Sequence, residues 1–271
     1  MTGPKGAGQR IGVNLTWLVP GVVGGSEEYT VRLLEGLVEE LRPDLNVRLY
    51  GRQDLFDTYP CLKIGYEAVP IPDQPRSKIR RVLMEQTWLA DVSKSDSVVH
   101  HMGGTMPLRP APPAQRQIVT IHDLQPLDMP ANFGWTKRRW LGHMIPRSVR
   151  RADKVVCPSR FTAQRLENLL STPASKIAVV HHGFEAPTDR PSPTSTLRRL
   201  GDQRFVLYPA IAYKHKRHRD VVEALALFAA ESATPRSAYS MADGGASATA
   251  GDEMHVVFTG RRGPNPTESI N

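Results

Sequence analysis

The sequence of 271 residues contains little cysteine, few aromatic residues and no long apolar segment. Two cysteines, Cys61 and Cys157, are too few for a disulfide framework or a structural zinc site, and they favour a cytoplasmic protein. No stretch approaches the roughly 20 consecutive apolar residues that a membrane-spanning helix needs. Basic residues are not interleaved with aromatic residues as in a nucleic-acid module, so nucleic acid is not an expected partner.

Common nucleotide-binding and nucleophile motifs are also missing. The glycine loop at residues 20–26 does not match G-x-G-x-x-G and carries no Walker lysine, so it predicts neither an NAD-dependent dehydrogenase nor a P-loop enzyme. No G-x-S-x-G elbow occurs. The loop joins an expected strand to an expected helix, where unpaired N–H groups favour an anion such as phosphate. A glycine turn that merely starts the helix is the alternative interpretation.

Positive charge is present in excess and is locally concentrated. Lys and Arg number 35 against 27 Asp and Glu, and residues 137–165 hold nine basic residues and one acid. Three interpretations remain open: a solvated helix face, a site for a polyanion, and an anionic membrane surface, where each basic residue contributes about 1 kcal/mol. The membrane or acceptor surface is expected at Lys137, Arg138, Arg139, Arg147, Arg150 and Arg151.

Apolar periodicity predicts strands that alternate with helices. In the first strand apolar residues alternate with small or polar ones from residue 11 to residue 19. The other strands of the first domain are expected at residues 46–50, 66–71, 97–102, 117–124, 154–158 and 176–181, and the helices at residues 27–41, 77–90, 135–151 and 160–170. Short apolar strands of this kind are typical of a parallel sheet covered on both faces, so the predicted fold class is α/β.

Composition divides the chain into two domains. Residues 1–185 form the first, residues 186–196 are a proline-rich linker, and residues 197–271 begin a second domain. The second domain has an expected strand at 205–210, a helix at 219–230 and a strand at 255–260. Residues 232–252 are a low-complexity insertion expected to lack regular structure. One β-α-β unit cannot cover both faces of a parallel sheet, so we expect a truncated domain.

Histidines lie near the carboxyl ends of two expected strands. His122 and Asp123 end the strand at 117–124, at the edge where open α/β sheets bind ligands. The alternatives for this group, which also includes His100, His101, His181 and His182, are metal binding, a role in the core and a histidine that donates a hydrogen bond to a bound polar ligand. Adjacent residues of a strand point to opposite faces, which disfavours a shared metal, and no metal site is expected.

The order and spacing of several segments resemble those of the retaining GT-B glycosyltransferases of glycosyltransferase family 4. The matching segments are VVGGSEEYT, VVHHMGG, TIHDLQPLDMPANF, RRADKVVCPSRFTAQRL, KIAVVHHGFE and RFVLYPAIAYKHKRHRDVVEALALF, which span roughly residues 10–230. HVVFTG fits the next strand of the family. The run HDLQPLDMPANF, followed by a basic helix, is most similar to bacterial mannosyltransferase-type members that build cell-surface glycans.

The resemblance implies two Rossmann-like domains that face a cleft. The C-terminal domain would hold a nucleotide sugar, GDP-mannose or a UDP-sugar, and the N-terminal domain a glycan or lipid-linked acceptor. A hexose, with mannose favoured, would be transferred with retained anomeric configuration and without a metal or other cofactor. The protein would be cytoplasmic, with peripheral contact to the inner face of the membrane as a further expectation.

Site residues are carried over from the resemblance by position. Gly24 and Gly25 are expected against the donor's diphosphate or transferred sugar. His122 is expected to hydrogen-bond the sugar near the reacting carbon, and Lys216 to neutralise the leaving diphosphate. On the residues alone, a solvated basic loop is an equal interpretation of the run at 213–219. Further candidates are Arg217 and Ser159.

Two departures from the family pattern are visible. Residues 210–212, Ala-Ile-Ala, replace the family's arginine before the lysine loop, and Arg217 replaces its asparagine. The family's Glu-x7-Glu segment, which binds the donor's ribose and sugar, is expected to lie beyond residue 271. We therefore expect weak donor binding and no activity from this chain alone. A non-catalytic module that binds a glycan lipid or a membrane surface is the alternative.

Overall fold

The computed structural model describes residues 9–40, 44–72, 78–183, 198–199, 201, 203–211, 213–233 and 255–259. The chain divides into two compact units, residues 1–185 (unit 1) and residues 186–271 (unit 2). The expected linker at 186–196 lies outside the described residues, and so do residues 234–252 of the low-complexity stretch. Residues 232 and 233 of that stretch are helical, contrary to the expectation of no regular structure.

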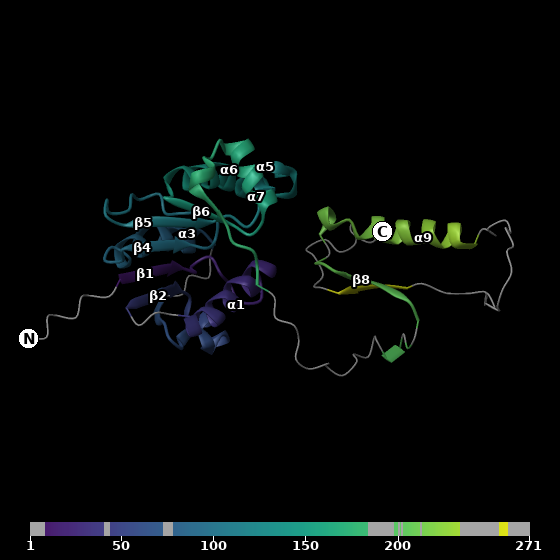
Figure 1. Ribbon diagram of the computed structural model, residues 1–271, viewed down its shortest axis with the longest axis horizontal. Coiled ribbons are helices and arrows are strands. Elements are labelled where there is room, and N and C mark those ends of the chain that lie inside the picture. Colours follow the sequence, from purple (N-terminus) through teal and green to yellow (C-terminus); the bar gives the residue numbers. More distant parts are fainter. Residues whose placement is uncertain are drawn as a thin grey trace, which may run out of the picture. The chain divides into compact units, whose positions relative to one another are not determined.

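Unit 1 contains a seven-stranded sheet in which all pairs of neighbouring strands are parallel (Figure 1). Its order is β3-β2-β1-β4-β5-β6-β7, so the direction in which strands are added reverses between β1 and β4. The strands are β1 Gln9–Asn14, β2 Leu45–Gly51, β3 Glu67–Pro70, β4 Val98–His101, β5 Arg116–Thr120, β6 Lys154–Cys157 and β7 Ile177–Val179. This arrangement confirms the predicted α/β, Rossmann-like class.

Helices or helical turns lie in the connections between the strands of unit 1, except between β4 and β5, where the described residues contain none. The longest are α1 Gly25–Glu40, α6 Trp135–Arg151 and α7 Arg160–Leu170. Shorter helices are α2 Gln53–Thr58, α3 Lys78–Met84, α4 Ala90–Val92 and α5 Gln125–Asp128, with a π turn at Glu85–Leu89 and 3-10 turns at Pro60–Lys63, Pro130–Asn132 and Ala174–Lys176. Figure 1 shows α5, α6 and α7 grouped beside β5 and β6, with α1 nearer β2.

Two apolar clusters form the core of unit 1. One joins β1, β2, α1 and α2 around residues such as Leu15, Leu49 and Phe56, which are at most 1% exposed. The other joins β5, β6, α6 and α7, where Val155 and Leu166 are fully buried. Burial of a large apolar side chain contributes about 1.5–3 kcal/mol, so these clusters account for much of the stability of the unit.

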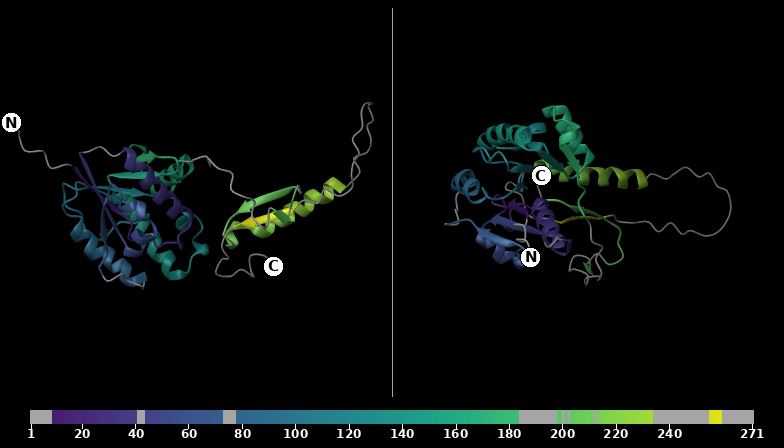
Figure 2. Two further views of the ribbon diagram at one scale, coloured as in Figure 1. Left: turned by 90° about the horizontal axis from the view of Figure 1, so that it is seen from below. Right: turned by 60° about the vertical axis from the view of Figure 1, so that its left-hand side comes forward.

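Unit 2 is a small β-α-β arrangement in the described residues. Strands β8 Phe205–Pro209 and β9 His255–Thr259 pair in parallel, and the helix α9 His218–Ala233 runs alongside them (Figure 2). A 3-10 turn, Lys214–Lys216, precedes α9. The helix begins one residue earlier and ends three residues later than the sequence predicted.

Two differences from the sequence prediction affect the site. The first strand ends at Asn14, because residues 15–19 turn away from the sheet even though their apolar alternation continues. The strand predicted at 117–124 ends at Thr120, so His122 lies in the loop that follows β5. Loop geometry frees this side chain from the alternation that a strand imposes.

Candidate active site at the carboxyl edge of unit 1

The strand order reverses between β1 and β4, which places a switch point at the carboxyl edge of the sheet. β1 leads into α1 and towards β2, whereas β4 leads towards β5, so the connections after these two neighbouring strands diverge. Ligands of open α/β sheets bind in the crevice at such a switch point. The loops that follow β1, β4, β5 and β7, together with the start of α1, supply the side chains at this edge.

Four aromatic rings gather there, and we call Trp17, Tyr29, His122 and His182 the ring cluster. The Tyr29 ring stacks on His182 with centroids 4.1 Å apart and meets His122 edge-on at 5.4 Å. Trp17 and His182 lie 6.3 and 6.5 Å from His122. Edge-to-face and stacked contacts at these separations are favourable, so the rings hold one another in place around His122.

The hydrogen bond of His122 fixes its tautomer. Its Nε2 lies 3.0 Å from the carbonyl oxygen of Met102, and because a carbonyl only accepts, Nε2 carries the proton. Burial lowers the pKa of His122, and nearby His182 lowers it further, although the bond to Met102 acts in the opposite direction. Nδ1 is therefore the nitrogen that remains for a ligand, and in the neutral ring it accepts a hydrogen bond.

Glycines allow the loops to approach the ring cluster. A Cβ atom at Gly103 would overlap the indole of Trp17, so only glycine fits beneath that ring. Gly24 has a φ of 86°, a left-handed conformation that favours glycine. A side chain at Gly25, the first residue of α1, would meet open space, which leaves that helix end sterically accessible. The donor-binding roles of Gly24 and Gly25 stay predictions.

His100 and His101 belong to the interior of unit 1. Nε2 of His100 lies 2.7 Å from the Thr120 hydroxyl, while His101 lies between Asn14 and Gln117 at 3.1 and 2.8 Å. Burial lowers the pKa of both histidines to about 4, so they are neutral at pH 7. Within the described residues, no three His, Cys, Asp or Glu side chains are placed to hold a metal ion.

The six basic residues predicted as one surface divide into two groups. Lys137, Arg138 and Arg139 are exposed near the start of α6, close to Trp135, whose side chain is 70% exposed. By contrast, Arg147 and Arg151 are half-buried, and both donate to the carbonyl oxygen of Leu108, at 2.6 and 3.0 Å. Arg150 is exposed at the end of the helix.

The other unit 1 candidate, Ser159, caps a helix. Its hydroxyl accepts a hydrogen bond from the backbone N–H of Thr162 at 3.1 Å, as an N-cap residue does at the start of α7. This contact accounts for a serine at the position without a ligand.

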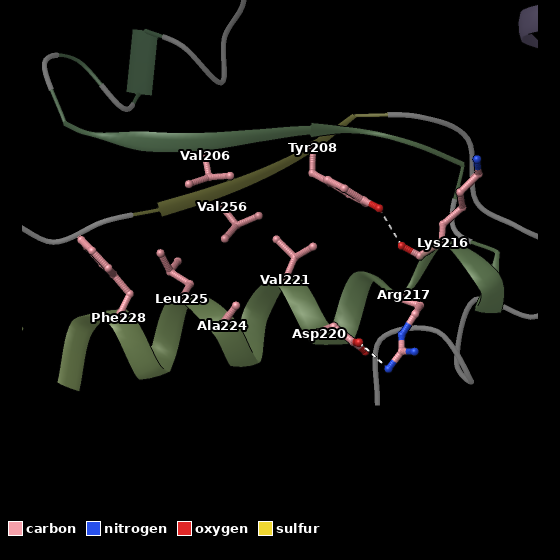
Figure 3. Close-up of a pocket in the computed structure, with 10 residues that line it drawn as sticks. All are labelled: Val206, Tyr208, Lys216, Arg217, Asp220, Val221, Ala224, Leu225, Phe228 and Val256. Atoms are coloured by element: carbon pink, nitrogen blue, oxygen red, sulfur yellow. Dashed lines mark hydrogen bonds and ion pairs between the residues drawn. The ribbon is translucent and has the colours of Figure 1, made fainter. Parts of the chain in front are cut away.

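Lys216 and Arg217 lie in unit 2, beside a pocket of about 570 Å³ between the strands and α9 (Figure 3). The pocket is lined mainly by apolar side chains, and the ammonium of Lys216 points away from them. Arg217 pairs with Asp220 at 2.5 Å and has a φ of 52°, which glycine and asparagine adopt more readily than arginine. An apolar pocket does not by itself offer a diphosphate site.

Sequence reasoning does not identify Trp17, Tyr29 and Gly103 as site residues. Tyr29 lies in the quoted segment VVGGSEEYT and Gly103 in VVHHMGG, but neither spacing nor composition distinguishes them from structural residues. The sequence marks His182 only as one of several histidines. These residues can be identified only in the folded structure, by their distance from His122.

Comparison with protein families gives a clear result for unit 1. Residues 23–186, more than half of the chain, match Glycosyltransferase Family 4. The chain belongs to Glycosyltransferase Family 4. The family segment begins in the glycine loop and includes Tyr29, His122 and His182, so most of the ring cluster lies within it. No curated protein shows significant sequence similarity to the chain.

Solved structures resemble this family 4 chain at low sequence identity. The Anabaena protein Alr3699/HepE, in complex with UDP and glucose, is 15% identical over 81% of this chain and 58% of its own, with a TM-score of 0.52. The S. aureus MnaA–UDP co-structure is 13% identical over 97% and 65%, with a TM-score of 0.50. A glycosyltransferase from Rickettsia africae is 17% identical over 82% and 57%, with a TM-score of 0.49.

These likenesses concern the fold. The first two support the α/β arrangement found here, with UDP present in both of those structures. The chain spans 57–65% of the length of these three proteins. No helix among the described residues is long and apolar enough to cross a membrane.

Proposed function

We propose that this chain is part of a glycosyltransferase that transfers a hexose, with mannose favoured, from a nucleotide sugar to a glycan or lipid-linked acceptor. The anomeric configuration is retained, and the product serves cell-surface polysaccharide synthesis. GDP-mannose or a UDP-sugar is the donor substrate, and no metal or other cofactor takes part. Family membership supports sugar transfer, and the UDP in two structures of similar fold supports a nucleotide-linked donor.

The observation that carries the proposal is the setting of His122. Three aromatic rings have centroids within 6.5 Å of the His122 ring, and Nδ1 of that ring can accept a hydrogen bond. Small-molecule sites combine aromatic side chains with a few polar groups in this way. A sugar presents C–H faces to such rings and hydroxyl groups to such a nitrogen. His122 therefore acts by accepting from a sugar hydroxyl near the reacting carbon.

Charge stabilisation is assigned to other residues. As the glycosidic bond to the diphosphate breaks, positive charge grows on the sugar and negative charge on the leaving group. Backbone N–H groups at Gly24 and Gly25 and the ammonium of Lys216 are the proposed partners of that negative charge, with Arg217 as a second cation. Ser159 keeps its capping role in this scheme.

Nuclear magnetic resonance of His122 tests the proposal directly. We expect UDP-glucose or GDP-mannose at high concentration to shift the His122 ring signals of this chain, and donor hydrolysis or transfer above the blank to follow for one of them in the complete enzyme that carries the Glu-x7-Glu segment. Retention predicts an α-linked product from an α-linked donor. NAD(H) binding without any response to nucleotide sugars would overturn the assignment, and a β-linked product would overturn retention alone.

The start of α6 is the proposed contact with the inner face of the cytoplasmic membrane. Trp135 is exposed and lies 5.4 Å from the Arg139 guanidinium carbon, while the ammonium of Lys137 lies 4.9 Å from the Phe133 ring. Aromatic rings among cations suit an interface that has anionic headgroups above an apolar layer. Arg147 and Arg151 are left out of this surface because they hold Leu108.

Vesicle flotation tests this contact. We expect binding to phosphatidylserine vesicles that weakens as salt rises, because the Debye length is only about 8 Å at 0.15 M. Replacing Lys137, Arg138 and Arg139 by glutamine should abolish it. A control with the same change in charge, in which glutamine replaces Lys63, Lys94 and Arg116, should bind normally. Equal binding to neutral vesicles would contradict the contact, and vesicle binding without any donor response would favour a non-catalytic module.

A further inference from the structure

A buried carboxylate closes the glycine loop of unit 1. Glu27 is 4% exposed, and its Oε1 accepts hydrogen bonds from the backbone N–H of Gly21 at 2.6 Å and from the Tyr59 hydroxyl at 2.8 Å. Its Oε2 accepts from the N–H of Val23 at 3.3 Å. One side chain thus binds two loop amides and a tyrosine that follows α2.

The position of Glu27 explains this reach. It is the third residue of α1, where a glutamate can bend back to the N–H groups that precede a helix, as in a capping box. Negative charge there also interacts favourably with the helix dipole. Burial by itself raises the pKa of Glu27, but the hydrogen bonds from Gly21, Tyr59 and the other loop amides outweigh it and lower the pKa below its usual value.

The same first turn of α1 positions a ring beside His122. Tyr29 follows Glu27 by two residues and lies between His182 at 4.1 Å and His122 at 5.4 Å. Gly24, on the other side of Glu27, accepts hydrogen bonds from the N–H groups of Glu27 and Glu28 at 2.9 and 3.2 Å. The loop, the start of the helix and the Tyr29 ring therefore share one anchor.

We infer that Glu27 is a positioning residue: by holding the amides of Gly21 and Val23 and the hydroxyl of Tyr59, it fixes the glycine loop and sets the Tyr29 ring against His122. Glu27 does not touch the reacting atoms. The effect on sugar transfer rests on the proposed function, whereas the effect on loop and ring geometry does not. Tyr59 is its partner in this role.

Hydrogen exchange and histidine titration of the full chain test the inference. We compare Glu27→Ala, Glu27→Gln and Tyr59→Phe with Glu28→Ala, a matched control one residue away whose side chain is exposed and pairs with Arg32. In Glu27→Ala the amides of Gly21 and Val23 should exchange about ten- to a hundredfold faster, the range that hydrogen bonds to a charged group supply. The His122 pKa should rise, because loss of Tyr29 packing admits water to the ring.

The other variants grade the effect. Glu27→Gln keeps one oxygen and should loosen Val23 more than Gly21, and Tyr59→Phe should produce a smaller increase at both amides. Glu28→Ala should leave exchange and titration unchanged. If Glu27→Ala does not fold, Glu27→Gln and Tyr59→Phe test the same effects on amide exchange and on the His122 titration, with smaller expected changes.

Two outcomes would overturn the inference. Unchanged exchange at Gly21 and Val23 would show that the carboxylate does not hold the loop. Faster exchange of these amides with an unaltered His122 titration would show that Glu27 caps the helix and holds the loop but does not position the Tyr29 ring. These readouts need no sugar, so a complete enzyme that transfers no sugar would count against the proposed function alone.

Discussion

Unit 1 and unit 2 both pair short apolar strands in parallel, yet they differ in burial. In unit 1 the strand residues Leu49, Val119 and Val155 are fully buried. In unit 2 Leu207 is 54% exposed, and Phe228 on the facing helix is 50% exposed. The strand sequences are alike in β-branched and aromatic content, so strand propensity does not make the difference. Burial comes from the number of strands and from the helices layered on them.

Removing matched leucines from the two units should give the largest contrast. Leu49→Ala should cost unit 1 about 2–5 kcal/mol, because a fully buried leucine leaves a cavity. Leu207→Ala should cost less than about 0.5 kcal/mol, because its side chain is largely in water. All four tryptophans lie in residues 1–185, so denaturant unfolding followed by tryptophan fluorescence measures the first value. Hydrogen exchange of the α9 amides measures the cost of Leu207→Ala. Equal losses of stability in the two variants would contradict the difference in burial between the units.

Lowering the pH should destabilise unit 1 through its two buried histidines. The pKa values of His100 and His101 are lowered from 6.5 to about 4, so the unfolded chain binds more protons between those values. Stability is then present above pH 6.5 and lost as pH falls towards 4. We expect a loss of about 2 kcal/mol per histidine between pH 7.5 and pH 5. Tryptophan-monitored denaturation at the two pH values checks this, and a flat pH dependence would disprove burial of neutral histidines.

Substitution of one site residue from each unit should separate their roles in transfer. In the complete enzyme, His122→Ala should lower kcat about 10²–10³-fold and raise the donor KM less, because the proposed contact strengthens in the transition state. Lys216→Ala should affect both kcat and KM, since the diphosphate is charged before and after bond breaking, although Arg217 can partly replace it. Initial rates over a range of donor concentrations distinguish the two patterns. His143→Ala, an exposed histidine of α6, is the control, and full activity of folded His122→Ala would refute the assignment.

The smallest expected effect concerns the turn before α9. Arg217→Asn should stabilise the start of this helix by about 0.5–1 kcal/mol, because asparagine tolerates the left-handed conformation better than arginine. Exchange of the first α9 amides should slow about two- to fivefold. Loss of the ion pair with Asp220 acts in the opposite direction but is exposed and weak. Faster exchange would show that the ion pair outweighs the backbone strain.

Much of the fold of unit 1 could be predicted, because the periodicity of the apolar residues and the length of each segment indicated the same kind of element. The helices at 135–151 and 160–170 match α6 and α7 residue for residue, since their apolar stripes are long and regular. The short helices α2 and α5 were not predicted, because four to six residues carry too little periodicity. The strand at 117–124 was extended four residues too far, because Ile121 and Leu124 are buried in the loop as if in a strand.

The candidate site was predictable only in outline. His122 and the glycine loop follow strands, and the ends of predicted strands indicate the edge of the sheet at which a ligand binds. Trp17, Tyr29 and His182 could not be selected, because their relation to His122 is set by packing between distant segments. The chemistry of His122 also depends on its tertiary contacts: Nε2–H donates to the Met102 carbonyl oxygen, so the ring accepts rather than donates at its remaining nitrogen.

The strand order has a consequence for how the site comes into being during synthesis. β2 and β3 add to one side of β1, and β4 to β7 then add in sequence to the other side, so each strand leaving the ribosome meets an open edge. No strand must be inserted between two that are already paired. His182 follows β7, the last strand of this sheet, so the ring around His122 is completed only when the whole sheet has emerged. A nascent chain of unit 1 therefore gains most of its packed core before its ring cluster is complete.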